Sequence, residues 1–478
     1  MIWILVAICA VVSVPAGLRW LRVAQREHYI PGEVSAFAWR WWRSTVLNNV
    51  IDLAATVGVI GSIWQSGLAF LVPAAQAGPI GLSVRGVTSP LAWTDRLKRL
   101  AAASGVVVVA LMTVGGLFDE PVLVVLPVYL LPSVVDLALW ILRPYEKRRG
   151  EEWVDRAVAK LESIGPAVVA ITGSYGKTTT KSYVTHLLGG SKRVVASPAS
   201  FNNRMGLARA INENLAPGTE VFVAEMGTYG PGEIAELCEW IPPDVAAITA
   251  IGPVHLERFG TLENIVRAKS EILDDAEVGV LNVDVPLLAD LAARRRDGMS
   301  LIEVSGEDVA APDGVFAGNL AVALGIGEAL GVTREEMTAR IAGLPTAEHR
   351  QSIMSAGTGF TIIDDTFNSN PAGARSALDT LARVGGDGEK AVITPGMVEL
   401  GHLQDSENEA FAALASEQVE HLVIVGRTNR KPLLRGSGKG TASVTVVDTR
   451  DEAVAWARAN LGPGDAVLYE NDLPDHYP

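Results

Sequence analysis

Long apolar runs with few charges fill the first 145 residues and constrain the fold more than any other feature of the chain. The run at residues 2–18 carries no charge, and further apolar runs occupy residues 50–84, 104–118 and 122–142. A helix that crosses a bilayer needs about 20 apolar residues. These runs also lack the polar stripe of a soluble helix, which argues against buried core helices. We therefore predict N-terminal transmembrane helices in a multi-span membrane region at residues 1–147.

The positive charges of this region indicate its orientation. Basic residues at 19–26 follow the first apolar run, whereas a signal peptide carries them before it, so we expect an uncleaved anchor with its N-terminus outside the cell. Helix pairs at 50–84 and 104–142 would give five passes and place every basic segment in the cytosol, although 50–84 could also form one long span. We predict a multi-pass plasma-membrane protein with the lipid bilayer as a partner and with its remaining domains in the cytoplasm.

Asp136 is a carboxylate within the apolar run 122–142. An ionisable residue inside the membrane usually marks a functional polar site. The same residue could instead pair with a basic neighbour near the interface. The sequence leaves both interpretations open.

Beyond residue 147 the composition changes, and valine-rich segments alternate with charged, alanine-rich ones. Such alternation is typical of α/β domains, in which helices cover both faces of a parallel sheet. We predict two such domains, at residues 148–345 and 346–478. The formal net charge of −14 argues against a nucleic-acid partner. Two cysteines, Cys9 and Cys238, are too few for a disulfide framework or a zinc cage, and Cys238 is expected to be a small buried residue.

The segment ITGSYGKTTTK, which begins at Ile171, has the form of a phosphate-binding loop. A strand is expected at 166–172 and a helix at 178–188, so the loop lies where the amides of a helix N-terminus bind phosphate. Lys177 can reach β- and γ-phosphates, and Thr178 can bind Mg²⁺. The usual loop has a further glycine five residues before the Gly-Lys pair, where this chain has Ile171. The sequence therefore predicts a variant phosphate loop.

The variant loop TGSYGKTT, at residues 172–179, resembles that of the Mur ligases, ATP-dependent amide-forming enzymes of peptidoglycan synthesis, which typically reads T-G-(S/T)-x-G-K-T-(T/S). Further segments resemble this family in the same order, and in part its branch that adds D-alanyl-D-alanine: SFNNRMGLA (200–208), VAEMGTYGPGEI (223–234), AITAIGPVHLERFGTLENIVRAKSEIL (247–273), LNVDVPLL (281–288), AEHRQ (347–351), IIDDTFNSNP (362–371) and TPGMVELG (394–401). The resemblance implies an α/β chain in which the transmembrane helices precede a Mur-ligase-type P-loop ATPase domain and a C-terminal Rossmann-like domain.

The resemblance also implies the residues of an ATP and metal site. The residues expected to contact the nucleotide are Gly173, Ser174, Gly176, Lys177, Thr178, Thr179, Asn282 (at adenine), Arg350 and Asp365 (at the ribose). The residues expected to bind two Mg²⁺ ions are Thr178, Glu225, His255 and Lys269. Lys269 would do so as a carbamate, since carbamylation turns a cation into the anionic oxygen ligand that Mg²⁺ prefers. Catalytic roles are expected for Lys177, His255 and Lys269.

The reaction implied by the resemblance joins an acid to an amine in peptidoglycan precursor synthesis. The acid attacks the γ-phosphate of ATP to form an acyl phosphate, and the amine then displaces phosphate. The expected partners are a small-molecule or lipid-linked carboxylate and an amino acid or dipeptide amine. A membrane-anchored ligase of poly-amino acids or other polymers would use the same ATP core. A non-enzymatic ATP sensor is a third interpretation, which the complete set of metal-binding residues disfavours.

The chain departs from the family at both ends. The relatives begin with a small soluble domain that binds the UDP part of their substrate, and apolar runs occupy that place here. Their final segment often carries a basic Lys-Gly motif, whereas this chain has the acidic segment DAVLYENDLPDHYP. Both departures concern substrate binding, so the acid could be UDP-linked or lipid-linked.

Overall fold

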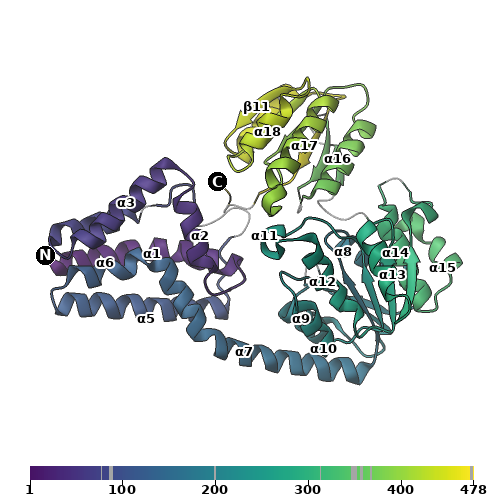
Figure 1. The fold of residues 1–478 in the computed structure, drawn as a ribbon, viewed down its shortest axis with the longest axis horizontal. Helices are drawn as coiled ribbons and strands as arrows, with labels where there is room; N and C mark the ends of the chain where they lie inside the picture. The colour runs from purple at the N-terminus through teal and green to yellow at the C-terminus, as the bar shows by residue number, and fades with distance from the viewer. Residues whose placement is uncertain are drawn as a thin grey trace. The chain divides into compact units, whose positions relative to one another are not determined.

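The computed structural model describes the chain except for residues 77, 85–89, 199–200, 313, 346–351, 356–358, 367–368, 474–476 and 478. The chain divides into two compact units (Figure 1). One comprises Met1–Arg149 with Leu473–Pro478, and the other comprises Gly150–Asp472. The domain boundaries expected near residues 147 and 345 stay predictions.

The N-terminal unit is helical. Its helices are α1 (Ile2–Arg26), α2 (Glu33–Trp42), α3 (Val46–Gly61), the 3₁₀ helix η1 (Ser66–Phe70), α4 (Leu71–Ala75), α5 (Asp95–Leu117), α6 (Pro121–Tyr129) and the first part of α7 (Leu131–Ile164). Their inward faces share one core, which includes Trp20. Their outward faces carry large exposed apolar side chains, among them Val11, Leu53 and Val106. Many large exposed apolar side chains on several helices are typical of a surface that meets lipid or another protein.

Two helices of this unit, α1 and α5, are long and apolar enough to cross a membrane, and the number rises to four if each bent helix pair forms one span. The bent pairs are α2 with α3 (114°) and α6 with α7 (74°). The described residues thus offer two to four candidate spans, and the five-pass arrangement is not supported. The reason lies in segment 50–84, where α3 is followed by the short helices η1 and α4 instead of a second long helix.

Asp136 caps a helix, which neither interpretation of the sequence anticipated. Its carboxylate accepts hydrogen bonds from the backbone N–H groups of Gly32 (2.9 Å), Val34 (3.4 Å) and Ser35 (2.8 Å). Gly32 directly precedes α2, and Val34 and Ser35 lie in its first turn, where backbone N–H groups have no partner within the helix. Asp136 on α7 therefore fixes the start of α2, and the negative charge suits the positive end of the helix dipole.

Replacing Asp136 by alanine is expected to destabilise the N-terminal unit by about 1–2 kcal/mol, because three N–H groups would lose their common acceptor. The measurement is the thermal unfolding of detergent-purified protein. Asp136→Asn keeps an acceptor oxygen and should lose less. Equal unfolding temperatures for wild type and Asp136→Ala would contradict the capping role.

The second unit begins with a parallel sheet of order β2-β3-β1-β4-β5-β6. Its strands are β1 (Ala167–Thr172), β2 (Val194–Ala196), β3 (Val221–Glu225), β4 (Val245–Ile248), β5 (Val278–Asn282) and β6 (Ser300–Val304). The helices that follow these strands are α8 (Lys177–Leu188), α9 (Arg204–Asn214), α10 (Glu233–Trp240), α11 (Leu256–Phe259), α12 (Leu262–Ser270), α13 (Pro286–Arg295), α14 (Ala317–Ala329) and α15 (Arg334–Thr338). The predicted strand, loop and helix around the phosphate loop are confirmed.

Successive side chains of a strand point to opposite faces of the sheet, so alternate residues of these strands lie in two separate cores of this domain. Val168 and Phe222 lie in one core with residues of α9, α10, α12, α13 and the end of α7. Ile171 and Val223 lie in the other core with residues of α8, α14 and α15. Because both faces are covered, the central strands are mostly apolar, and their polar residues stand at their ends.

The last domain contains a second sheet of order β11-β10-β9-β12-β8-β7, in which only β7 is antiparallel. Its strands are β7 (Ser352–Ser355), β8 (Thr361–Asp365), β9 (Lys390–Thr394), β10 (His421–Val425), β11 (Ser443–Val447) and β12 (Ala466–Glu470), and its helices are α16 (Pro371–Val384), α17 (Gln404–Gln418), α18 (Arg430–Ser437) and α19 (Arg450–Asn460). The predicted α/β class is confirmed in both domains.

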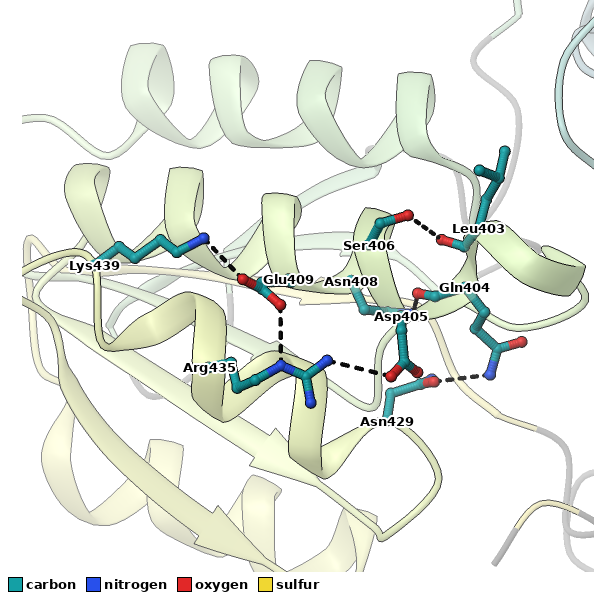
Figure 2. Close-up of polar contacts among 9 residues, drawn as sticks. All are labelled: Leu403, Gln404, Asp405, Ser406, Asn408, Glu409, Asn429, Arg435 and Lys439. Carbon is teal, nitrogen blue, oxygen red and sulfur yellow. Dashed lines mark hydrogen bonds and ion pairs between the residues drawn. The ribbon is translucent and has the colours of Figure 1, made fainter.

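Polar contacts join α17 to the region of α18, and two asparagines from these elements bind the loop after β9. Figure 2 shows Glu409 on α17, which accepts hydrogen bonds from Lys439 Nζ (2.8 Å) and Arg435 Nε (3.0 Å). Asn429, just before α18, donates to the carbonyl of Met397 (3.0 Å), and Asn408 accepts from the N–H of the same residue (2.8 Å). The loop that leads to Glu399 is therefore held from two helices.

Candidate nucleotide and metal site

The backbone of the phosphate loop requires glycine at two positions. Gly173 (φ 153°) and Gly176 (φ 79°) adopt conformations that side chains disfavour. A Cβ atom on Gly173 would collide with Thr249 Oγ1, and one on Gly176 would collide with Asn319 Oδ1. Both glycines are therefore required by the backbone conformation and by close neighbours, and we call the turn that they form the phosphate cradle.

The segment after β4 holds the loop in this shape. The N–H of Ser174 donates to the carbonyl of Ala250 (2.7 Å), and the Ser174 hydroxyl lies 3.1 Å from the carbonyl oxygen and 3.0 Å from the amide nitrogen of Gly252. The hydroxyl of Thr249 donates to the carbonyl of Tyr175. Ser174 thus anchors the loop through Gly252, and its hydroxyl is already engaged there.

The first turn of α8 carries the residues expected at the phosphates. Lys177 Nζ donates to the carbonyl of Gly173 (2.8 Å), so its ammonium lies over the loop. Thr178 Oγ1 donates to Glu225 Oε2 at 2.9 Å. Thr179 is buried. The structure thus places Lys177, Thr178 and Glu225 close together, while their roles at a nucleotide stay predictions.

Glu225 is a buried, ionised carboxylate at the end of β3, 1% exposed. Its Oε2 atom accepts from both Thr178 Oγ1 and Lys181 Nζ, each at 2.9 Å, and Oε1 accepts from Asn202 Nδ2 at 3.3 Å. Burial raises the pKa of Glu225, but the positive charges of Lys181 and Lys177, together with hydrogen bonds from Lys181 and Thr178, hold the pKa below the ordinary value. The carboxylate is therefore charged at neutral pH.

Lys181 and Asn202 are site residues that the sequence reasoning missed. Both signals were present in the sequence. Lys181 follows Lys177 by four residues, and that spacing places two side chains on one face of a helix. Asn202 stands in the quoted segment SFNNRMGLA, to which no role was assigned.

Lys269 lies on α12 and is 5% exposed. Its ammonium has no hydrogen-bond or ion-pair partner among the residues that the structure describes. Burial, and to a lesser degree the charge of Lys177, lower the pKa of Lys269 well below its usual value. The environment therefore favours the neutral amine, which is the form that reacts with CO₂ to give a carbamate.

The contacts of His255 are different from those of Thr178 and Glu225. It has a positive φ of 53° just before α11, and its Nδ1 shares a hydrogen bond with the carboxylate of Glu399 in the last domain. The ring of Tyr229 meets its edge at a centroid distance of 5.1 Å. In the described part of the chain, no hydrogen bond or ion pair joins His255 to Glu225 or Lys269. Its predicted role at a metal stays a prediction.

The remaining predicted nucleotide residues lie at strand ends. Asn282 ends β5, donates to the carbonyl of Thr249 (3.3 Å) and accepts from the N–H of Asp284 (3.1 Å). Asp365 ends β8, directly across from Glu470 of β12, and both are buried. Arg350 lies outside the described residues. Strand ends are where open α/β sheets bind ligands.

The residues present fit a magnesium ion that arrives with phosphates. The described residues contain no group of three or more His, Cys, Asp or Glu side chains that could hold a metal by themselves. Mg²⁺ in nucleotide sites is usually held by one or two carboxylates together with phosphate oxygens and water. Glu225 and Thr178 supply such hard oxygen atoms beside the phosphate cradle.

Comparison with protein families agrees with this geometry. Residues 171–324 match the model of the Mur ligase middle domain, and residues 349–469 match that of the Mur ligase glutamate ligase domain. The UDP-N-acetylmuramoyl-tripeptide–D-alanyl-D-alanine ligase of Mycobacterium tuberculosis is 30% identical over 457 residues, which cover 82% of this chain and 87% of the relative. That of Bacillus subtilis is 29% identical over 343 residues, or 66% and 75% of the two chains.

Solved structures show the same fold. MurF from Acinetobacter baumannii superposes with a TM-score of 0.60 at 22% identity and covers 68% of this chain and 77% of its own. MurF ligase from Thermotoga maritima, solved in complex with ADP, has a TM-score of 0.59 at 25% identity, with coverages of 68% and 80%.

Proposed function

The chain belongs to the Mur ligase family of ATP-dependent amide-forming enzymes of peptidoglycan precursor synthesis, and on that premise we propose that its phosphate loop activates a carboxylate substrate with ATP. The observation that carries this proposal is the contact of Thr178 with Glu225 beside Lys177, at the glycine cradle. This arrangement supplies a cation at the phosphates and two oxygen ligands for Mg²⁺.

The reaction proceeds in two steps. An oxygen of the substrate carboxylate attacks the γ-phosphorus of ATP, the bond to the β-phosphate oxygen breaks, and ADP leaves. The amine nitrogen then attacks the acyl carbon, phosphate leaves with the bonding electrons, and the nitrogen loses a proton. Lys177 neutralises charge on the transferring group, while Thr178 and Glu225 would hold a Mg²⁺ ion, which supplies further positive charge there.

Lys269 is proposed to carry a carbamate. The support is its burial without a partner in the described part of the chain and its lowered pKa, both of which favour the reactive neutral amine. A carbamate would place a negative charge near Lys177, whose positive charge reaches Lys269. The modified side chain would then add an oxygen ligand for a second Mg²⁺ ion.

The amine is proposed to be an amino acid or dipeptide such as D-alanyl-D-alanine, which the names of the relatives specify. The acid is proposed to be a peptidoglycan precursor held at the membrane. The support is the exposed apolar surface of the N-terminal unit and the two helices that are long and apolar enough to span a bilayer. The protein would then lie in the plasma membrane with its ligase domains in the cytoplasm, where ATP is found.

A truncated protein that begins at Gly150 tests whether ATP binding depends on the second unit alone and whether binding of the acid needs the N-terminal unit. It keeps a compact unit, including Val154, Ala157 and Leu161 of α7, which pack into the core of the ATP domain. We expect it to be soluble and to bind Mg·ATP with an affinity close to that of the full-length protein. It should lose ligation of an acid that is held in the bilayer. The measurements are ATP affinity and amide formation for both proteins side by side, with lipid-linked and UDP-linked acids.

Equal ligation of a soluble UDP-linked peptide by both proteins would contradict the membrane-held substrate. The N-terminal unit would then be an anchor only, and the acid would be the ordinary soluble precursor. Loss of ATP binding by the truncated protein would contradict the assignment of the nucleotide site to residues after 170.

A further inference from the structure

A second lysine on α8 lies beside the carboxylate that is assigned to the metal. Lys181 follows Lys177 by one helical turn and its side chain is 6% exposed. Its Nζ atom is 2.9 Å from Oε2 of Glu225, whose side chain is 2% exposed. A buried carboxylate and a buried ammonium are each costly alone, so the two charges stabilise each other.

The Lys181 ammonium is hydrogen-bonded to the Glu225 oxygen that a metal beside Thr178 would need as a ligand. Oε2 of Glu225 accepts from Thr178 Oγ1 as well as from Lys181 Nζ, both at 2.9 Å. The other oxygen, Oε1, accepts from Asn202 Nδ2 at 3.3 Å. Among these donors only Lys181 carries a charge. Lys181 therefore satisfies the carboxylate in the way that a bound cation would.

The charges of this cluster disfavour a free divalent cation. Lys177 and Lys181 contribute two positive charges and Glu225 contributes one negative charge, so the three side chains together are positive. A Mg²⁺ ion that approaches Oε2 alone meets the repulsion of the ammonium, which is strong at short range inside a protein. Nucleotide phosphates at the loop would add negative charge and reverse this balance.

We propose that Lys181 is a positioning residue that takes the place of the metal on Glu225. Its ammonium neutralises the carboxylate and keeps it aligned with Thr178 while no metal is bound. It thereby weakens the binding of free Mg²⁺, so that the metal enters together with the nucleotide. The inference takes the identity of the metal site from the proposed function, but it concerns the order of binding and not the substrates.

The test is the binding of Mn²⁺, as a spectroscopic substitute for Mg²⁺, to full-length protein in detergent without nucleotide. Electron paramagnetic resonance of free Mn²⁺ gives the affinity directly and requires no turnover. Lys181→Met removes the charge at similar volume and should tighten binding of free Mn²⁺ by about tenfold or more. In the presence of ADP the difference between the variant and wild type should shrink. Unchanged or weaker binding of free Mn²⁺ by Lys181→Met would overturn the proposal.

Further variants separate charge from folding. Lys181→Gln keeps a hydrogen-bond donor without the charge, and it should also bind free Mn²⁺ more tightly, which decides the matter if Lys181→Met does not fold. Lys181→Arg keeps the charge and should behave like wild type. Lys192→Met, at a lysine just beyond α8, is the matched control. Tight binding of free Mn²⁺ by wild type that disappears in Glu225→Gln would also overturn the proposal.

The two proposals fail in different ways. If the protein formed no amide with any acid and amine, the proposed function would be wrong, and the Mn²⁺ measurement would still report on Lys181. If the protein is an active ligase but Lys181→Met binds free Mn²⁺ no better than wild type, only the role of Lys181 is wrong.

Discussion

Lys177→Ala is expected to lower ATP-dependent ligation by at least about 100- to 1000-fold, the usual effect of removing one preorganised group that stabilises transition-state charge. Phosphoryl transfer depends mainly on positioning and charge neutralisation, and the Lys177 ammonium lies over the cradle where the γ-phosphate is expected. The fold should survive, because the loop is held by Ser174 and Thr249 through contacts that do not involve the lysine side chain.

The measurement is ADP release and amide formation by detergent-purified protein, with thermal unfolding as the check on folding. Lys192→Ala is a matched lysine control outside the loop and should keep full activity. ADP release near the wild-type rate by a folded Lys177→Ala protein would remove the basis for assigning this loop to ATP.

The second large effect is expected for Lys269→Ala, with a loss of activity of about 100-fold or more. If the lysine carries a carbamate, the substitution removes an anionic ligand from the metal site. A short carboxylate such as acetate can enter the space left in the core and supply oxygen atoms in its place. We therefore expect acetate, added at increasing concentration, to restore part of the activity.

The neighbouring Arg267 provides the control, because it lies on the same helix but is exposed. Arg267→Ala should keep its activity and show no response to acetate. Full activity of Lys269→Ala would mean that the lysine has no part in the reaction. A loss that acetate cannot reverse, in a protein that still folds, would argue against the carbamate.

Local sequence patterns were enough to predict most of the fold of the second unit. The strand expected at 166–172 is found at Ala167–Thr172, and the expected alternation of strands and helices is present in both α/β domains. These strands are short apolar runs bounded by glycine, proline or charged residues, and such boundaries are local properties of a sequence. The antiparallel strand β7 carries little of that signal, and it was not predicted.

The errors concern contacts between residues that are distant in the chain. Asp136 caps a helix that begins about 100 residues earlier, and no local pattern indicates such a partner. The sequence left open whether segment 50–84 forms one span or two, because hydropathy measures composition, whereas turns and bends decide how long each helix is.

At the candidate site, too, contacts between residues distant in the chain could not be predicted from the sequence. Thr178 and Lys177 belong to a local motif and were identified at once. The ion pair of Lys181 with Glu225 joins helix α8 to the end of strand β3. The hydrogen bond of His255 with Glu399 joins two domains. Resemblance to a family supplied Glu225 and His255, but it did not supply the contacts of Glu225 with Lys181 and Asn202 or of His255 with Glu399. Those followed only from the folded structure.

The sheet order β2-β3-β1-β4 has a consequence for the evolution of this protein. It places the ends of β3, β1 and β4 side by side, so the contacts that shape the phosphate loop and orient Glu225 come mainly from residues 172–252, a short stretch of one gene. Fusion of a new segment ahead of that stretch need not alter the machinery that consumes ATP. The proposed delivery of the acid by the N-terminal unit could therefore differ between proteins that share the same ATP-consuming segment.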